Sequence, residues 1–301
     1  MPLFTVFTPA YNRAWSLPRV FNSLKAQTLK NFEWVIIDDG STDNTKELVE
    51  KWKQEADFSI VYQWQPNQGK HIAYNAVAKL AKGELFTSID SDDEVIPEAL
   101  EIMTKRWSQV TEEQKKFVSG IMFVSKDQYG NIIGDRFPED GEICDLVEML
   151  LVRKVKGDKG GFLQTRVLKM YPFPESVKNV LVPEGVYIHQ MSHDWKMMCI
   201  NDVLRVYWID EREDHLGNSF MGTKSFSGIR FLHLAMLNFS IRFFWKIPKL
   251  FLATSSHYTK VSLYLKIGLR KQWADIKTNT GRILWLLTLP IGWFLYLKEK
   301  K

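Results

Sequence analysis

Three acidic residues lie within four positions at Asp90, Asp92 and Asp93, directly after the apolar run 86–89. Carboxylates held this close repel one another unless a positive group lies among them. In an extended segment alternate side chains share a face, so we expect Asp90 and Asp92 to point the same way. Hard oxygen donors on one face suit Mg²⁺ or Mn²⁺, particularly an ion shared with substrate phosphates. A solvated acidic turn that caps the next helix is the alternative that this spacing leaves open.

Two kinds of pattern alternate before this acidic segment. Short runs rich in β-branched and aromatic residues predict strands at 3–8, 33–37, 58–63 and 84–89. Apolar residues at helical spacing predict helices between them at 16–27, 42–54 and 70–82. Such alternation predicts right-handed βαβ units, and therefore an α/β fold with a mostly parallel sheet flanked by helices.

Polar clusters follow three of the predicted strands, at 8–12, 38–41 and 90–93. Parallel sheets bind ligands at the carboxyl ends of their strands, where such clusters meet. Three clusters at one edge favour a single binding site over three unrelated turns.

Four motifs in this region carry a resemblance to a known family. The segments PAYN at 9–12, VIIDDGSTD at 35–43, NQGK at 67–70 with Asn75, and DSDD at 90–93 resemble family 2 glycosyltransferases in order and spacing. The resemblance implies a GT-A (Rossmann-like) fold and a nucleotide-diphosphate sugar donor, most often UDP-linked. It also implies a divalent ion, Mn²⁺ or Mg²⁺, and transfer with inversion at the anomeric carbon.

The resemblance also implies roles for residues at the first two strand ends. Thr8 and Ala10 would offer backbone contacts to the donor, and Tyr11 would stack on the nucleobase. Asp38 would accept from the base and Asp39 from the ribose hydroxyls. An ordinary turn aromatic at Tyr11 and a helix cap at Asp39 are the structural alternatives.

Further roles fall on the later motifs. Lys70 opens a predicted helix, where its ammonium would meet phosphate or base, and Asn75 would contact the donor one turn later. Asp90 would face the ribose and the metal ion, and Asp92 would ligate the ion directly. Asp93 would support Asp92 or cap the following helix. A solvated surface lysine is the alternative for Lys70.

Family members place the catalytic base at the start of a helix well after the acidic motif. Glu184, in VPEG at 182–185, precedes a predicted helix at 186–198 and is the candidate base, although Gly185 replaces the second acid of the usual Glu-Asp pair. Asp194 inside that helix is the reserve candidate. Segment 157–162 predicts a flexible loop that leads into a strand, or simply a glycine turn. The resemblance implies that this segment lines the acceptor side.

The charge distribution divides the 301 residues at about Arg230. The net charge is +5, yet from Arg230 onward thirteen Lys and Arg face only Asp275 and Glu299. The balance is +11 in this tail and −6 before it. We therefore predict a catalytic domain at 1–229 and a basic, aromatic-rich helical tail at 230–301.

Three interpretations compete for the tail, beside simple packing on its own domain. Nucleic-acid binding is disfavoured because no binding motif is present and the aromatics lie in apolar clusters. A membrane-spanning helix at 283–297 is disfavoured because the uncharged run covers about 22 Å of a roughly 30 Å hydrocarbon core, and Pro290 and Gly292 weaken this interpretation further. Amphipathic helices on an anionic membrane surface are the preferred interpretation.

The N-terminus runs straight into the first predicted strand without a signal sequence, and Cys144 and Cys199 are far apart in sequence. Neither a disulfide scaffold nor a zinc site is expected, which favours a reducing compartment. We therefore expect a peripheral or monotopic enzyme on the cytoplasmic face of the inner or plasma membrane.

The preferred function is a metal-dependent transferase that moves a sugar to a lipid-linked or oligosaccharide acceptor in cell-surface polysaccharide synthesis. A nucleotide-sugar binding protein without turnover is the alternative. A nucleotidyltransferase is less favoured, because the glycine-rich basic phosphate loop is missing after the first strand.

Overall fold

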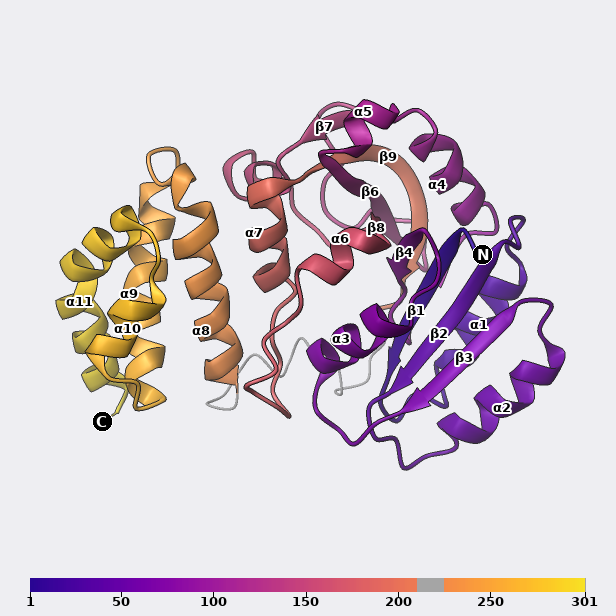
Figure 1. Cartoon of the computed structure of the whole chain (residues 1–301), viewed down its shortest axis with the longest axis horizontal. Coiled ribbons are helices and arrows are strands. Elements are labelled where there is room, and N and C mark those ends of the chain that lie inside the picture. The colour runs from indigo at the N-terminus through magenta and orange to yellow at the C-terminus, as the bar shows by residue number, and fades with distance from the viewer. Residues whose placement is uncertain (210–224, 301) are drawn as a thin grey trace. The chain divides into compact units, whose positions relative to one another are not determined.

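The computed structural model describes residues 1–209 and 225–300, and they form two compact units (Figure 1). Among the described residues, the first unit comprises 1–145, 155–172 and 195–209. The second comprises 146–154, 173–194 and 225–300.

The first unit is an α/β structure around one sheet. Its strands are β1 (Phe4–Ala10), β2 (Phe32–Asp38), β3 (Ser59–Trp64), β4 (Leu85–Ser88), β5 (Glu94–Val95), β6 (Val118–Asp127), β7 (Glu142–Cys144), β8 (Lys159–Gln164) and β9 (Lys196–Tyr207). Its helices are α1 (Leu17–Lys25), α2 (Thr45–Glu55), α3 (Lys70–Leu80), α4 (Ala99–Trp107), α5 (Glu112–Lys115) and α6 (Thr165–Met170). Strands β1 to β4 and helices α1 to α3 match the predicted elements to within three residues at each end.

The strand order in the described residues is β3-β2-β1-β4-β8-β6-β9-β5, with β7 paired to β9. Strands β1 to β4 are parallel to their neighbours in this group, as predicted, and lie side by side in Figure 1. Beyond them the sheet is mixed, because β8 runs antiparallel to both β4 and β6, while β6 and β9 are parallel. The carboxyl ends of β1 to β4 therefore share one edge, which is where the predicted polar clusters lie.

Helices cover both faces of the sheet. The predicted stripe of α1, Leu17, Val20, Phe21 and Leu24, is buried together with side chains of α2 and α4 against one face. On the opposite face Tyr74 of α3 packs edge-on against Phe7 of β1, with ring centroids 5.0 Å apart. The strands are thus buried on both sides, as their near-continuous apolar sequences require.

A close backbone approach explains the glycine after α3. A Cβ added to Gly83 would lie 2.3 Å from the backbone nitrogen of Thr5. Only glycine therefore fits where the α3–β4 connection passes the start of β1.

The predicted helix at 186–198 was wrong at its C-terminal end. Helix α7 (Gly185–Asp194) ends at Asp194, and β9 begins at Lys196. The segment from Lys196 to Cys199 pairs with both β6 and β7, so strand pairing overrides the helical spacing of its apolar residues. The strand predicted after the loop at 157–162 is present, but β8 starts at Lys159, so residues 159–162 belong to the strand and not to the loop.

The same pairing brings together the two cysteines, which are far apart in sequence. Cys144 on β7 and Cys199 on β9 are both buried free thiols, and their Sγ atoms lie 3.2 Å apart. Sequence separation gave no indication of this proximity.

The second unit is helical. Besides α7 it contains the π-helices η1 (Glu148–Val152) and η4 (Met236–Ser240), the 3₁₀ turn η5 (Ile241–Phe243), and the helices α8 (Phe226–Ala235), α9 (Pro248–Tyr264), α10 (Leu269–Asp275) and α11 (Asn279–Glu299). An apolar core of its own holds these elements together, and Val147, directly before η1, and Phe251 from α9 are buried in it.

Two features of this unit bear on the sequence predictions for the tail. Pro290 does not interrupt α11, which is continuous over 21 residues and packs along α9. Within the described part of the chain, α11 alone is long and apolar enough to cross a membrane by length and composition. The compact units also do not divide at residue 229, since 146–154 and 173–194 group with the helical unit. The functional boundary at 229/230 stays a prediction.

Candidate active site

The loop after β1 is tied to the loop after β2. Asn12 has a φ of 54°, in the left-handed region that asparagine tolerates, and its backbone N–H donates to Ser41 Oγ at 2.8 Å. Its Oδ1 accepts from the backbone N–H of Thr42 at 2.8 Å. The backbone N–H of Asp39 donates to the carbonyl of Ala10 at 2.8 Å. Two predicted clusters therefore form one structural unit at the sheet edge.

The two β1 residues and Tyr11 have different environments. Thr8 is fully buried, and its hydroxyl accepts from Trp34 Nε1 at 3.0 Å, so its side chain holds the core. Ala10 is buried, and its carbonyl accepts the hydrogen bond from the backbone N–H of Asp39 in the loop after β2. Tyr11 is 49% exposed beside them and is accessible to a ligand.

Asp38 and Asp39 organise the loops around them. Asp38 Oδ1 accepts from the backbone N–H of Ser41 at 2.7 Å, and Oδ2 accepts from the Tyr62 hydroxyl at 2.5 Å. Asp39 Oδ1 accepts from Gln65 Nε2 at 2.7 Å, and Oδ2 accepts from the backbone N–H of Gly69 at 2.7 Å. Asp39 thus shapes the turn that leads into α3, a role that the sequence analysis did not assign.

Lys70 starts α3 as predicted, with Gly69 at the preceding N-cap position. Its ammonium lies 2.8 Å from Asp90 Oδ1, which joins the third loop to the acidic motif. Burial alone would raise the pKa of Asp90, but the adjacent Lys70 ammonium, with Arg205 and Arg13 further away, lowers it below its usual value. Asp90 is therefore a carboxylate at neutral pH. Asn75 lies on the same helix and is buried.

Asp93 is buried beneath the acidic motif rather than capping a helix. The N-cap of α4 is Glu98, so the capping alternative for Asp93 was wrong. Asp93 Oδ1 accepts from the backbone N–H of Trp208 at 3.3 Å, and Oδ2 lies 3.6 Å from Arg205 Nε. Burial raises the pKa of Asp93 to about 8, and the nearby carboxylates of Asp90 and Asp92 add to the increase that Arg205 opposes.

Arg205 is a buried residue that the sequence analysis missed. It lies on β9, donates to Ser125 Oγ at 3.1 Å, and forms an ion pair with Asp158. Burial alone would lower the pKa of Arg205, but Asp158 and Asp93 raise it above its usual value, so the guanidinium stays charged. An arginine inside the apolar run VLRVY was the available signal, because a buried charge requires a partner.

Asp92 is half-buried, and its backbone carbonyl accepts from Arg19 Nη1 at 3.5 Å. The same guanidinium stacks on Trp208, 4.1 Å from the ring centroid. No cluster of three or more His, Cys, Asp or Glu suited to a metal ion occurs within 1–209 and 225–300. The ligand set of Asp90 and Asp92 nevertheless fits Mg²⁺ or Mn²⁺, because such ions are commonly held by one or two carboxylates plus substrate phosphates.

Both candidate bases belong to the second compact unit. Glu184 directly precedes α7, and its backbone carbonyl accepts from Tyr187 at 3.1 Å. Asp194 is the last residue of α7, and its Oδ1 lies 2.7 Å from His193 Nδ1 on the exposed surface. The carboxylates of the acidic motif, in contrast, all belong to the first unit.

Comparison with known proteins identifies the class. Residues 5–136, which include the four strand-end loops, match glycosyl transferase family 2. These residues match a family 2 glycosyltransferase domain, and similar curated proteins are glycosyltransferases, so the chain is an enzyme of the transferase class. Both the resemblance drawn from the four motifs and the preferred enzyme class are confirmed.

Similarity to one relative extends over almost the whole chain, and similarity to another is confined to about a third of it. An uncharacterized glycosyltransferase of Nostoc sp. is 26% identical over 99% of this chain and 91% of its own length. A chondroitin synthase of Pasteurella multocida is 37% identical, over 36% of this chain and 11% of that protein.

Solved structures support the fold. TarS of S. aureus, crystallised with UDP-GlcNAc, superposes with a TM-score of 0.66 at 19% identity, over 97% of this chain and 80% of that one. A mannosyltransferase of Pyrobaculum calidifontis, in complex with GDP-Man and Mn²⁺, gives a TM-score of 0.53 at 15% identity, over 100% of this chain and 88% of that one. The expected GT-A type of α/β fold is confirmed.

Proposed function

We propose that the chain transfers a sugar from a nucleotide-diphosphate sugar, UDP-linked, to a hydroxyl of a lipid-linked or oligosaccharide acceptor. One observation carries this proposal: loops after four strands of the sheet are bonded to one another at a single edge, and Lys70 and Asp90 meet there. The ligands named for TarS and for the mannosyltransferase, UDP-GlcNAc and GDP-Man, support a donor of this class.

The donor roles follow from the exposed and charged groups at this edge. Tyr11 offers an exposed ring for the nucleobase. We assign the remaining lone pairs of the buried Asp38 and Asp39 to the base and the ribose, beside the backbone of Thr8 and Ala10. The ammonium of Lys70 lies 2.8 Å from Asp90 Oδ1, and we assign it to the diphosphate next to the acidic motif. Asn75 is assigned to the donor from the motif alone.

We assign Asp92, with Asp90, to a divalent ion, Mn²⁺ or Mg²⁺. When bound, the ion supplies Lewis acidity that offsets charge on the departing nucleoside diphosphate. Asp90 is suited to this because Lys70 keeps it ionised, and Asp92 follows on the same short segment. Arg205 pairs with the buried Asp93, the residue after Asp92, and this contact helps to fix the position of the acidic motif.

Transfer with inversion requires a base on the face opposite the leaving group. We assign Glu184 to accept the proton of the acceptor hydroxyl as that oxygen bonds to the anomeric carbon, with Asp194 in reserve. Such a base is worth roughly 10²–10⁴-fold in rate.

The setting we propose is the cytoplasmic face of the inner or plasma membrane, in cell-surface polysaccharide synthesis. The basic tail, with a balance of +11, supports contact with an anionic surface, where a lipid-linked acceptor would be available.

The metal assignment is tested with Asp92→Asn. Release of nucleoside diphosphate from a UDP-sugar with Mn²⁺ should collapse in this variant, and Mn²⁺ binding measured by calorimetry in the presence of UDP should weaken. Asp57→Asn, which alters an exposed carboxylate paired with Lys30, is the matched control and should behave like the wild type. Full activity of Asp92→Asn would refute the assignment.

The base assignment is tested with Glu184→Gln and Asp194→Asn. We expect Glu184→Gln to bind donor normally but to transfer about 10²–10⁴-fold more slowly. If Glu184→Gln transfers at the normal rate and Asp194→Asn transfers slowly, the catalytic base is Asp194. Normal transfer rates in both variants would exclude both residues as the catalytic base.

A further inference from the structure

Helix α11 has two distinct faces. The residues buried against the rest of its unit are Gly281, Leu284, Trp285, Thr288 and Gly292. The large apolar side chains that stay exposed, at 44% to 70%, are Ile283, Leu286, Leu287, Ile291, Trp293, Phe294 and Leu297. At 3.6 residues per turn this second set falls within an arc of about 160°.

The buried face is fastened to α9 by close and specific contacts. A Cβ added to Gly292 would lie 2.6 Å from the carbonyl oxygen of Ser256, so the two helices touch backbone to backbone. Thr288 Oγ1 donates to Ser255 Oγ at 2.8 Å. Near the end of the helix, Glu299 pairs with Lys260 at 2.9 Å.

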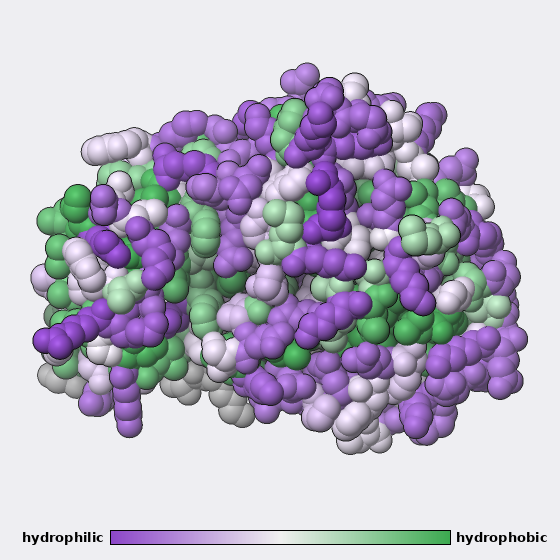
Figure 2. Space-filling view, in the orientation of Figure 1, coloured by the Kyte–Doolittle hydropathy of each residue, from purple (hydrophilic) through white to green (hydrophobic). Residues whose placement is uncertain are grey.

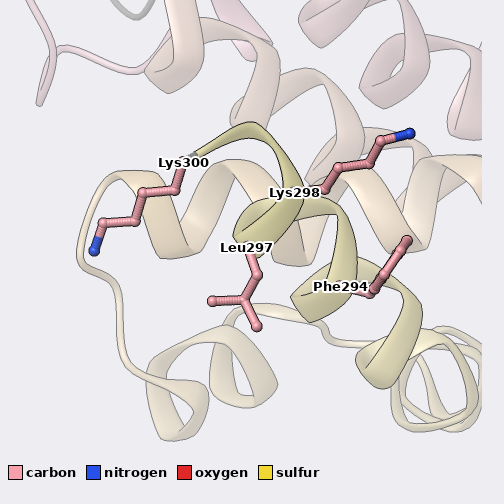
Figure 3. A pocket seen from close by; sticks show the side chains of 4 residues that line it. All are labelled: Phe294, Leu297, Lys298 and Lys300. Carbon is pink, nitrogen blue, oxygen red and sulfur yellow. The ribbon is translucent and has the colours of Figure 1, made fainter.

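The exposed face is apolar along its length and cationic at both ends. No charged residue lies between Arg282 and Lys298. Figure 2 shows hydrophobic patches interspersed with hydrophilic side chains over the region of α9 to α11. Phe294, Leu297, Lys298 and Lys300 line a hollow of about 600 Å³, and Figure 3 shows the two ammonium groups extended to either side of the apolar pair.

We propose that this face of α11 docks on a bilayer of anionic phospholipid, with the helix lying in the plane of the interface and still packed on α9. The inference deepens the membrane partner of the proposed function and rests on it. Leu286, Leu287 and Phe294 enter the acyl boundary, while Arg282, Lys298 and Lys300 meet lipid phosphates. An exposed apolar stripe of this kind marks an interaction surface.

The packing favours lying over spanning, although α11 is long enough to cross. Crossing alone would strip α11 from α9 and take Thr288 into hydrocarbon without its bond to Ser255. Crossing together with α9 would carry Lys260 into the bilayer core. Both are unfavourable, because polar and charged groups are costly in the bilayer core. In the plane of the interface the bonds between α9 and α11 remain, and only the apolar arc leaves water.

Charge complementarity favours lipid over a second copy of the chain. The tail carries +11, and two such surfaces would repel one another, whereas an anionic leaflet attracts them. The cations flank the apolar arc at its two ends, where headgroups would lie.

Binding is tested by flotation of the full chain with neutral phosphatidylcholine vesicles and with vesicles containing phosphatidylglycerol. We expect binding to the anionic vesicles and at least a tenfold loss in the double variant Leu287→Glu and Phe294→Glu. Tyr129→Glu, at an 80% exposed aromatic of the first unit, is the matched control and should bind normally. Lys298→Ser with Lys300→Ser should weaken binding to anionic vesicles by roughly fivefold per lysine.

Orientation is tested with a fluorophore on Ile283→Cys or on Leu297→Cys, since the native cysteines are buried. A membrane-impermeant reductant added outside the vesicles should bleach both labels if α11 lies in the interface. Protection of either label would show a spanning helix and overturn the inference.

Two further outcomes would also overturn the proposal. One is equal vesicle binding by the wild type and the double glutamate variant. The other is a dimer, detected by light scattering without lipid, that the same variant dissociates. Donor hydrolysis measured without vesicles separates this inference from the catalytic proposal. The double glutamate variant should hydrolyse the donor like the wild type. If the wild type floats with vesicles but does not hydrolyse the donor, only the catalytic assignment is refuted.

Discussion

His233 on α8 gives a prediction about acid stability. Its Nδ1 is buried without a hydrogen-bond partner among the described residues, and its ring lies 6.0 Å from that of His257. Burial lowers the pKa of His233 to about 4, with further lowering by His257 and Lys260. The ring is therefore neutral in the folded chain across most of the acidic range.

The sign of the effect follows from proton binding. Between pH 6.5 and pH 4 the unfolded chain takes up a proton at His233 and the folded chain does not, so stability falls as the pH falls. The full loss is about 3.4 kcal/mol, because each pKa unit corresponds to about 1.4 kcal/mol. At pH 5.0 about 2 kcal/mol of it should already be lost.

The perturbation is His233→Gln, which stays neutral at every pH. Urea unfolding of the wild type and of the variant at pH 8.0 and pH 5.0 gives four free energies of unfolding. Subtracting the change between the two pH values in the variant from that in the wild type cancels the contributions of titratable groups common to both proteins. On acidification the free energy of unfolding of the variant should fall by about 2 kcal/mol less than that of the wild type. An equal loss in both proteins would refute the assignment of a buried, neutral His233.

Two further substitutions probe the supports of the site and of the tail. Arg205→Met should lower the free energy of unfolding by about 1–3 kcal/mol, because the buried Asp93 and Ser125 lose their polar partner; a urea midpoint like that of the wild type would contradict this. Gly292→Ala should cost about 1–3 kcal/mol in thermal unfolding, since its Cβ meets the backbone of Ser256, whereas Ile291→Ala on the exposed side should change little. If the two alanine variants melted alike, the close packing of α9 and α11 would be wrong.

The first ninety residues were predictable because their signals are local. Leu17, Val20 and Phe21 repeat at helical spacing, and the short β-branched runs between helices leave one topology. Parallel strands then bring their carboxyl ends together, which is why the loops of Asn12 and Asp39 were expected at one edge.

Contacts between distant segments were not predictable in this way. Arg205 and Asp93 are more than a hundred residues apart, and neither has a local pattern that indicates the other. The spacing of apolar residues around Met197 suits a helix, but this segment forms a strand because it pairs with β6. Pro290 signals a helix end by local rules, yet packing along α9 keeps α11 continuous.

The interleaved composition of the helical unit has a practical consequence for truncation. Residues 146–154 and 173–194 contribute Val147, Leu151 and Ile188 to the same apolar core as α9 and α11. A stop codon near residue 230 would leave these side chains without their neighbours, so insolubility of the shortened product would say nothing about lipids. Point substitutions on exposed surfaces are the sounder way to separate catalysis from anchoring in this chain.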